Sequence, residues 1–137
     1  MVRELMHDPF FLGQESEEAT KEDIGVAQDL MDTLVAHKDG CVGMAANMIG
    51  VKKRIICFLD GETYMTMFNP VILKATDSYK TEEGCLSLLG GPRPCKRYKK
   101  IRVQYQTEEM KVKSRVFEGF TAQIIQHEID HLNGILI

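Results

Sequence analysis

Gln126-His127-Glu128-Ile129-Asp130-His131 stands close to the carboxyl end of this 137-residue chain and contains the pattern H-E-x-x-H. On a helix, His127 and His131 lie one turn apart on the same face, so both imidazoles can bind one divalent cation. Glu128 then lies beside a water on that cation. A surface helix with charged residues does not require two histidines and a glutamate at this spacing. The stretch therefore predicts a metal-binding helix with Glu128 as proton acceptor.

A third protein ligand is expected upstream, because the six residues after His131 include no His, Cys, Asp or Glu. Cys85, within Glu83-Gly84-Cys85-Leu86-Ser87, is the strongest candidate. A thiolate with two neutral imidazoles forms a catalytic set for iron, zinc, cobalt or nickel that leaves one position open. His7, His37 and the other three cysteines have no neighbouring ligand at a metal spacing, and there is no C-x-x-C pair. A site with only two protein ligands, and Cys85 as a small buried apolar residue, are the alternatives.

Length and composition indicate one globular domain over residues 1–137, and the motif above makes it a candidate metalloprotein. The chain is 44% hydrophobic and 27% charged, with a net charge of −3 that gives no electrostatic footprint for nucleic acid. No apolar run reaches membrane-spanning length, and the first residues lack the apolar region of a signal peptide. Four cysteines without a secreted-domain pattern fit a reducing compartment. We therefore expect a cytoplasmic protein with no membrane partner.

The pattern of apolar residues predicts an α+β fold. We expect short antiparallel strands in small sheets around a central C-terminal metal-binding helix, plus one long N-terminal helix. The N-terminal helix is expected from a cap at Thr20 to about His37, and the last helix from about Thr121 to Leu132 with Gly134 as its C-terminal cap. The expected strands are 54–59, 63–68 and 70–74, with a turn at Asp60-Gly61, and a hairpin of 101–105 with 112–116 across 107–109.

Two segments leave alternatives open. The basic stretch 88–100 is expected to be a solvated loop, although an anionic partner, or a contact of Arg93 or Arg97 with a peptide substrate, is also conceivable. The apolar residues Ile135, Leu136 and Ile137 are expected to pack against the domain, with a dimer built on them as the alternative.

Three segments together resemble the peptide deformylase family. Glu83-Gly84-Cys85-Leu86-Ser87 and Gln126-His127-Glu128-Ile129-Asp130-His131 match its second and third motifs, and Cys41-Val42-Gly43-Met44-Ala45-Ala46-Asn47-Met48 resembles the first. The order and rough spacing match from residue 20 to residue 134. The first segment differs from the family motif in two places: Cys41 replaces a glycine and Met48 replaces a glutamine. In the family, the side-chain amide of that glutamine donates a hydrogen bond to the negatively charged oxygen (the oxyanion) that forms during hydrolysis. A thioether cannot donate a hydrogen bond. Asn47 can, but in an extended segment its side chain would point away from the metal.

The resemblance implies hydrolysis of the N-formyl group from formyl-methionyl ends of nascent polypeptides. It implies attack by metal-bound hydroxide with Glu128 as general base and acid, and oxyanion binding by the metal and the backbone N–H of Leu86. It further implies that Val42, Gly43, Gly84 and Ile124 bind the substrate beside His127. Iron(II) is the expected metal, with Zn²⁺, Ni²⁺ or Co²⁺ as alternatives. The ribosome during translation is a further expected partner, and a monomer or weak homodimer the expected state.

Other functions compete with this one. Met48 favours a weakened paralogue that binds formylated or otherwise N-blocked peptides. A purely structural metal has no use for Glu128 and normally takes four protein ligands, and a metalloprotease normally takes its third ligand downstream.

Overall fold

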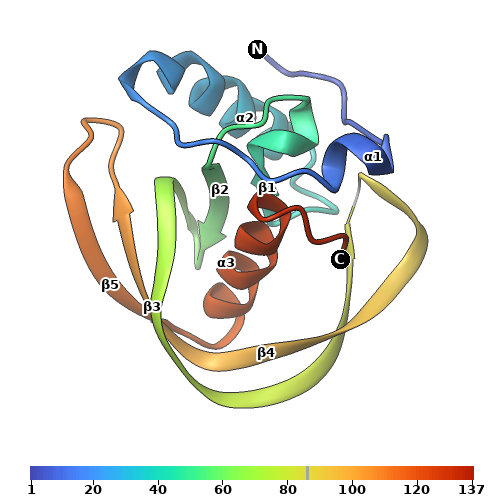
Figure 1. Ribbon diagram of the computed structural model, residues 1–137, viewed down its shortest axis with the longest axis vertical. Helices are drawn as coiled ribbons and strands as arrows, with labels where there is room; N and C mark the ends of the chain where they lie inside the picture. The colour runs from blue at the N-terminus through green and yellow to red at the C-terminus, as the bar shows by residue number, and fades with distance from the viewer. Residues whose placement is uncertain (86) are drawn as a thin grey trace.

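The computed structural model describes residues 1–85 and 87–137 (Figure 1). In chain order its elements are α1 (Pro9–Leu12), η1 (Lys21–Asp23), α2 (Ile24–Ala36), β1 (Gly43–Ala45), η2 (Ala46–Ile49), β2 (Ile55–Asp60), β3 (Thr63–Cys85), β4 (Leu88–Gln106), β5 (Val112–Glu118) and α3 (Gly119–Leu132), where η denotes a 3₁₀ helix. None of the helices in the described ranges is long and apolar enough to cross a membrane.

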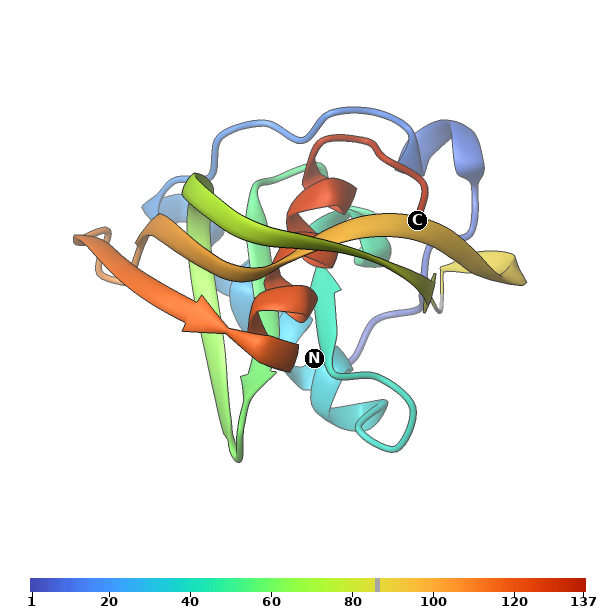
Figure 2. The same cartoon turned by 90° about the horizontal axis from the view of Figure 1, so that it is seen from below.

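The strands form one antiparallel sheet instead of the small sheets expected. Within the described residues it has five strands in the order β1-β2-β3-β4-β5. Strands β3 and β4 are 23 and 19 residues long and curve around α3, which lies on their concave side (Figures 1 and 2). The segments predicted as two strands, 63–68 and 70–74, are parts of β3, joined at an irregularity between Phe68 and Val71 where Asn69 has a φ of 51°.

The prediction of a solvated loop over 88–100 is wrong, because this segment belongs to β4 and pairs with β3. Charged residues are compatible with a strand when alternate side chains face water while the backbone continues the ladder. Residues 100–103 alternate in this way: Lys100 and Arg102 are exposed, and Ile101 and Val103 are buried. Within the basic stretch, Lys96, Lys99 and Lys100 are exposed in the same way, whereas Arg97 is buried.

Strand β2 is buried on both faces and separates two apolar clusters. Ile56 and Phe58 face α3, while Ile55 and Cys57 face α2. Period-two alternation thus gives β2 two inward faces, which explains its continuous apolar sequence. On α2, the buried Ala27, Leu30 and Leu34 recur at helical spacing and cover this second face.

The carboxyl end of α3 requires a glycine. Gly134 has a φ of +75°, and a Cβ there would lie 2.6 Å from the carbonyl oxygen of Gly13. Of the three apolar residues that follow, Ile137 is buried, but Ile135 and Leu136 are 47% and 39% exposed. The expectation that all three pack against the domain therefore holds for Ile137 alone.

The turn that follows β2 also differs slightly from the prediction. It consists of Gly61 and Glu62, one position later than the predicted Asp60-Gly61.

Candidate metal centre

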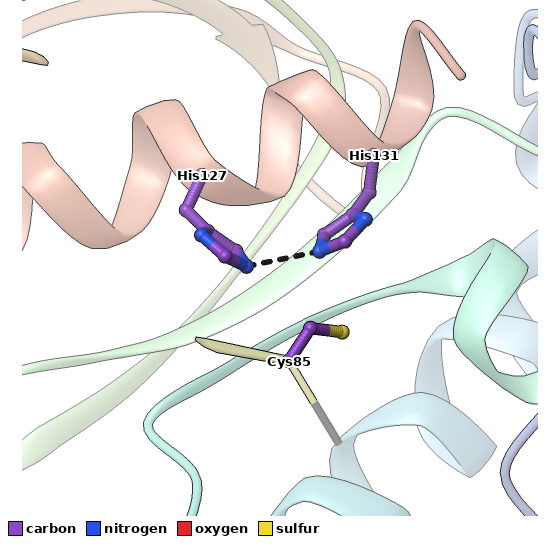
Figure 3. Close-up of side chains that lie close together, drawn as sticks. All are labelled: Cys85, His127 and His131. Carbon is purple, nitrogen blue, oxygen red and sulfur yellow. Dashed lines mark hydrogen bonds between the residues drawn. The ribbon is translucent and has the colours of Figure 1, made fainter. Parts of the chain in front are cut away.

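Cys85, His127 and His131 converge at the junction of the sheet and α3. Cys85 is the last residue of β3, and the two histidines project from successive turns of α3. Their donor atoms all lie within 4.8 Å of one another. Figure 3 shows the two imidazole rings approaching each other, with Cys85 across from them. Among the described residues, this is the group of His, Cys, Asp and Glu side chains with the spacing of a metal site.

The chemistry of these donors fits a cation. The Nε2 atoms of His127 and His131 face each other at 2.9 Å, which requires a proton or another positive centre between two lone pairs. Burial lowers the pKa of His131 to about 3, so this imidazole is neutral, as a metal ligand must be. Burial also lowers the pKa of His127, but hydrogen bonds to Cys85 and Glu83 outweigh this effect and raise it to about 10. A cation that binds at Nε2 of His127 therefore displaces a proton.

Glu83 fixes the orientation of His127. Its Oε1 accepts a hydrogen bond of 2.6 Å from Nδ1–H of His127, which turns Nε2 toward the cluster. Burial raises the pKa of Glu83, but hydrogen bonds from His127, Arg97 and Gln123 lower it overall to about 2. The carboxylate is thus ionised and available to its donors. Glu83 stands two residues before Cys85, so the same strand supplies one candidate ligand and the partner of another.

Arg97 holds this carboxylate in place. Its guanidinium donates to both oxygens of Glu83, at 2.7–3.0 Å, and to Oδ2 of Asp130 at 2.7 Å. With 4% of its surface exposed, Arg97 joins β3, β4 and α3 in one buried ion-pair network. The suggestion that Arg97 touches a peptide substrate is therefore wrong. The requirement of a metal-binding imidazole for an acidic partner could have identified Glu83 from the sequence, whereas nothing local identified Arg97.

Glu128 is buried against β1. It is 3% exposed, and its Oε1 has no hydrogen-bond partner among the described residues. Burial raises its pKa to about 7, which places the carboxyl close to balance between its two protonation states at neutral pH. A Cβ on Gly43 would lie 2.9 Å from Oε2 of Glu128 and 2.6 Å from Cγ2 of Ile124. The glycine in the first motif is therefore needed for the close approach of β1 to this carboxylate.

A cleft of about 500 Å³ opens beside these side chains. It brings together the residues predicted to bind substrate, namely Val42, Gly43, Gly84 and Ile124, with Met48, Cys85, His127 and Glu128. His131 lies behind this lining and is 1% exposed. Cys41 of the first motif also lines the cleft, whereas the sequence did not point to the other wall residues Glu82, Gly91, Pro92, Phe120 and Gln123. These residues come from separate segments, and only the fold places them together.

The first motif differs locally from the extended segment expected. Residues 46–49 form η2, so the expectation that Asn47 points away by strand alternation does not apply. Nδ2 of Asn47 instead donates to the backbone carbonyl of His131 at 2.9 Å, which ties η2 to α3. Met48 is 2% exposed and lies in the cleft wall. Leu86, whose N–H the sequence nominates as an oxyanion donor, lies outside the described residues.

The side chains of Cys85, His127 and His131, with the buried carboxyl of Glu128 beside them, form a candidate mononuclear metal site of the H-E-x-x-H class. The model of the polypeptide deformylase family matches residues 5–137, and the chain belongs to that family. A peptide deformylase of Clostridium beijerinckii is 56% identical over 137 residues, all of both chains. One of Thermoanaerobacter pseudethanolicus is 39% identical over 111 residues, which cover 81% of this chain and 69% of that protein.

Solved structures agree with this assignment. The class I type b peptide deformylase of Acinetobacter baumannii bound to Met-Ala-Ser superposes with a TM-score of 0.89 at 28% identity, covering 99% of this chain and 97% of that one. The peptide deformylase of Thermotoga maritima gives the same TM-score and identity, with 99% and 95% covered. The resemblance found in the sequence motifs is therefore confirmed.

Replacement of Cys85 by serine should weaken metal retention far more than it disturbs the fold. A serine hydroxyl is a much poorer donor than a thiolate for the soft and borderline cations that this donor set suits. Metal analysis after dialysis against a chelator should show a large loss, while the melting temperature of metal-free protein stays near that of the parent. Cys41→Ser is the matched control, since Cys41 lies in the same cleft but outside the cluster. Equal retention in both variants would exclude Cys85 as a ligand.

Gly43→Ala should displace Glu128 without removing the metal. The added methyl group meets Oε2 of Glu128 and the Ile124 side chain at distances that real Cβ atoms do not tolerate. We expect overpacking to cost about 1–3 kcal/mol of stability, measured by urea denaturation. Metal content should stay at the parental level. Gly84→Ala is the control, because a Cβ there meets nothing within 4 Å; equal destabilisation by both substitutions would contradict the packing argument.

Proposed function

We propose that this chain removes the N-formyl group from formyl-methionyl ends of nascent polypeptides and releases formate. The observation that carries the proposal is the convergence of the Cys85, His127 and His131 donor atoms within 4.8 Å, with the buried Glu128 beside them in the cleft. Family membership supports the reaction, and the relative bound to Met-Ala-Ser supports a peptide with an amino-terminal methionine as the ligand. We infer that residues 1–137 act as one metallohydrolase domain.

Cys85, His127 and His131 would hold one divalent cation. When bound, such a cation lowers the pKa of water to roughly 7 and polarises a carbonyl oxygen. Iron(II) is our proposal for the native metal, since one thiolate and two imidazoles suit it, and Zn²⁺, Ni²⁺ and Co²⁺ fit the same donors. The cluster has three donors in the described part of the chain, which favours a catalytic role over a structural site closed by four protein ligands.

Glu128 is the proposed general base and acid. Its buried carboxyl has a pKa raised to about 7, so it can accept a proton from water and return one to the departing amine at neutral pH. Its Oε1 has no partner among the described residues, so this oxygen is not committed to a structural hydrogen bond. The absence of a side chain at Gly43 leaves room for this carboxyl against β1. A proton shuttle of this kind contributes about 10²–10⁴-fold to rate.

The substrate would lie along β1. Strand β1 lies at one edge of the sheet and, among the described strands, pairs with β2 alone. Its other edge can therefore pair with an extended peptide. We propose that the backbone of Val42 and Gly43 makes this pairing and that Val42 and Ile124 contact the methionine side chain, with Gly84 in the opposite wall. The formyl hydrogen stands where an internal peptide carries a Cα, so a narrow site admits the formyl group and rejects internal amides. The N–H of Leu86 remains a proposed donor to the formyl oxygen.

The proposed substrate is produced during translation, so we propose the ribosome as the place of encounter and a monomer or weak homodimer as the acting form. A weakened paralogue that binds N-blocked peptides is the second candidate. Met48 favours it, because a thioether in the cleft wall offers no hydrogen bond to an oxyanion. Activity measurements separate the two.

Anaerobically purified, iron-loaded protein should release formate from a formyl-Met peptide. Glu128→Gln should keep the metal, because Glu128 is outside the ligand set, yet lose about 10²–10⁴-fold in kcat with the proton acceptor removed. Formate is measured with a coupled assay and metal content by elemental analysis on the same samples. No formate from metal-replete parent protein would refute the proposed function. Near-parental turnover in Glu128→Gln would refute the role of Glu128 alone.

Met48→Gln should raise kcat by about 10²–10³ with little change in KM, because loss of one oxyanion donor typically costs that factor. Met48→Leu, which is apolar and similar in size, should match the parent and controls for altered packing. Steady-state kinetics on a formyl-Met peptide give both parameters. Fast turnover in the parent together with no gain in Met48→Gln would show that another group already serves the oxyanion, and would eliminate the weakened-paralogue alternative.

A further inference from the structure

The pairing of β3 with β4 is irregular in the hairpin that carries Cys85. Glu83 pairs with Arg93, and Cys85 pairs with Leu88. Between these two pairs the chain moves by two residues in β3 but by five in β4. A bulge of this size interrupts the ladder and leaves its backbone groups out of register. The regular part of the β3–β4 ladder therefore ends at Glu83, and Cys85 needs a second anchor to keep a fixed position against α3.

His7 supplies a contact at this hairpin. Its Nδ1 lies 3.0 Å from the carbonyl oxygen of Ser87, a residue 80 positions later in the chain and two after Cys85. A carbonyl only accepts hydrogen bonds, so Nδ1 carries the proton and donates. Ser87 is buried, with 1% of its surface exposed, whereas His7 is an exposed residue. The hydrogen bond therefore joins a surface imidazole to a buried residue of the hairpin.

The segment around His7 is itself anchored. The backbone N–H of Met6 donates to the carbonyl of Met48 at 2.7 Å, and the Asp8 side chain accepts from the N–H of Phe10 at the start of α1. Met48 and Cys85 both line the cleft. Residues 6 and 7 thus connect η2 with the Cys85 hairpin, and both of these segments contribute to the cleft wall.

We propose that His7 is a positioning residue for Cys85, holding the hairpin so that the thiolate faces His127 and His131. The inference rests on the proposed function only in that it takes these three residues as the metal ligands. His7 does not belong to the ligand cluster and does not line the cleft, so it acts on the site through its hydrogen bond to Ser87, two residues after Cys85.

Cobalt binding by the full chain tests this proposal. Co²⁺ bound to a thiolate gives a near-ultraviolet charge-transfer band, and competition with a chelator gives the affinity. We expect His7→Ala to lower cobalt affinity about 2- to 10-fold, the effect of one lost hydrogen bond, and to reduce or shift the band. His7→Asn, whose side-chain N–H can replace Nδ1–H, should restore most of both. If His7→Ala fails to fold, His7→Phe keeps a ring without that donor and carries the same expectation.

His37→Ala is the matched control, because Nδ1 of His37 also donates to a backbone carbonyl, that of Thr33 at 2.9 Å, but on α2. It should leave affinity and band unchanged. Parental affinity and band in His7→Ala, no recovery in His7→Asn, or an equal loss in His37→Ala would each overturn the proposal. Cobalt uptake needs no substrate, so a parent that binds cobalt through its thiolate but releases no formate refutes the proposed function and leaves the result for His7 standing.

Discussion

The site depends on one buried ion-pair network. Arg97 of β4 pairs with Glu83 of β3 and Asp130 of α3, and Glu83 in turn accepts the Nδ1 proton of His127. Removing Arg97 would leave the buried carboxylate of Glu83 without its charged partner, and breaking a buried pair in this way typically costs about 3–5 kcal/mol. The network therefore links the stability of the sheet-to-helix junction with the orientation of a candidate metal ligand.

The same junction sets the positions of the other groups. Helix geometry alone places His127 and His131 on one face of α3, but Cys85 reaches them only because the long strands β3 and β4 curve around that helix (Figures 1 and 3). On the opposite side, Gly43 lets β1 approach closely enough to bury Glu128, and burial raises the pKa of that carboxyl to about 7. A stable interior and a reactive carboxyl thus arise from one packing arrangement.

The sequence predicts fold and site where the signal is local or carried by a motif. Helical spacing predicts α3 and its two histidines, and the motif at residues 83–87 singles out Cys85. The prediction fails where pairing between residues far apart in the chain decides the structure. The basic residues of 88–100 resemble a solvated loop because their charge is visible in the sequence, whereas pairing with β3 and burial of Arg97 against Glu83 are not. The cleft wall of Phe120 and Gln123 was missed for the same reason.

X-ray absorption spectroscopy of the anaerobically iron-loaded protein would identify the proposed ligands, because it counts the sulfur and imidazole neighbours of the metal. We expect one sulfur and two imidazole nitrogens from the protein, with the remaining positions filled by oxygen or nitrogen atoms of exchangeable solvent or of a bound inhibitor. A metal shell without sulfur would contradict the role of Cys85. A shell closed by four protein ligands would contradict a catalytic site in this cleft.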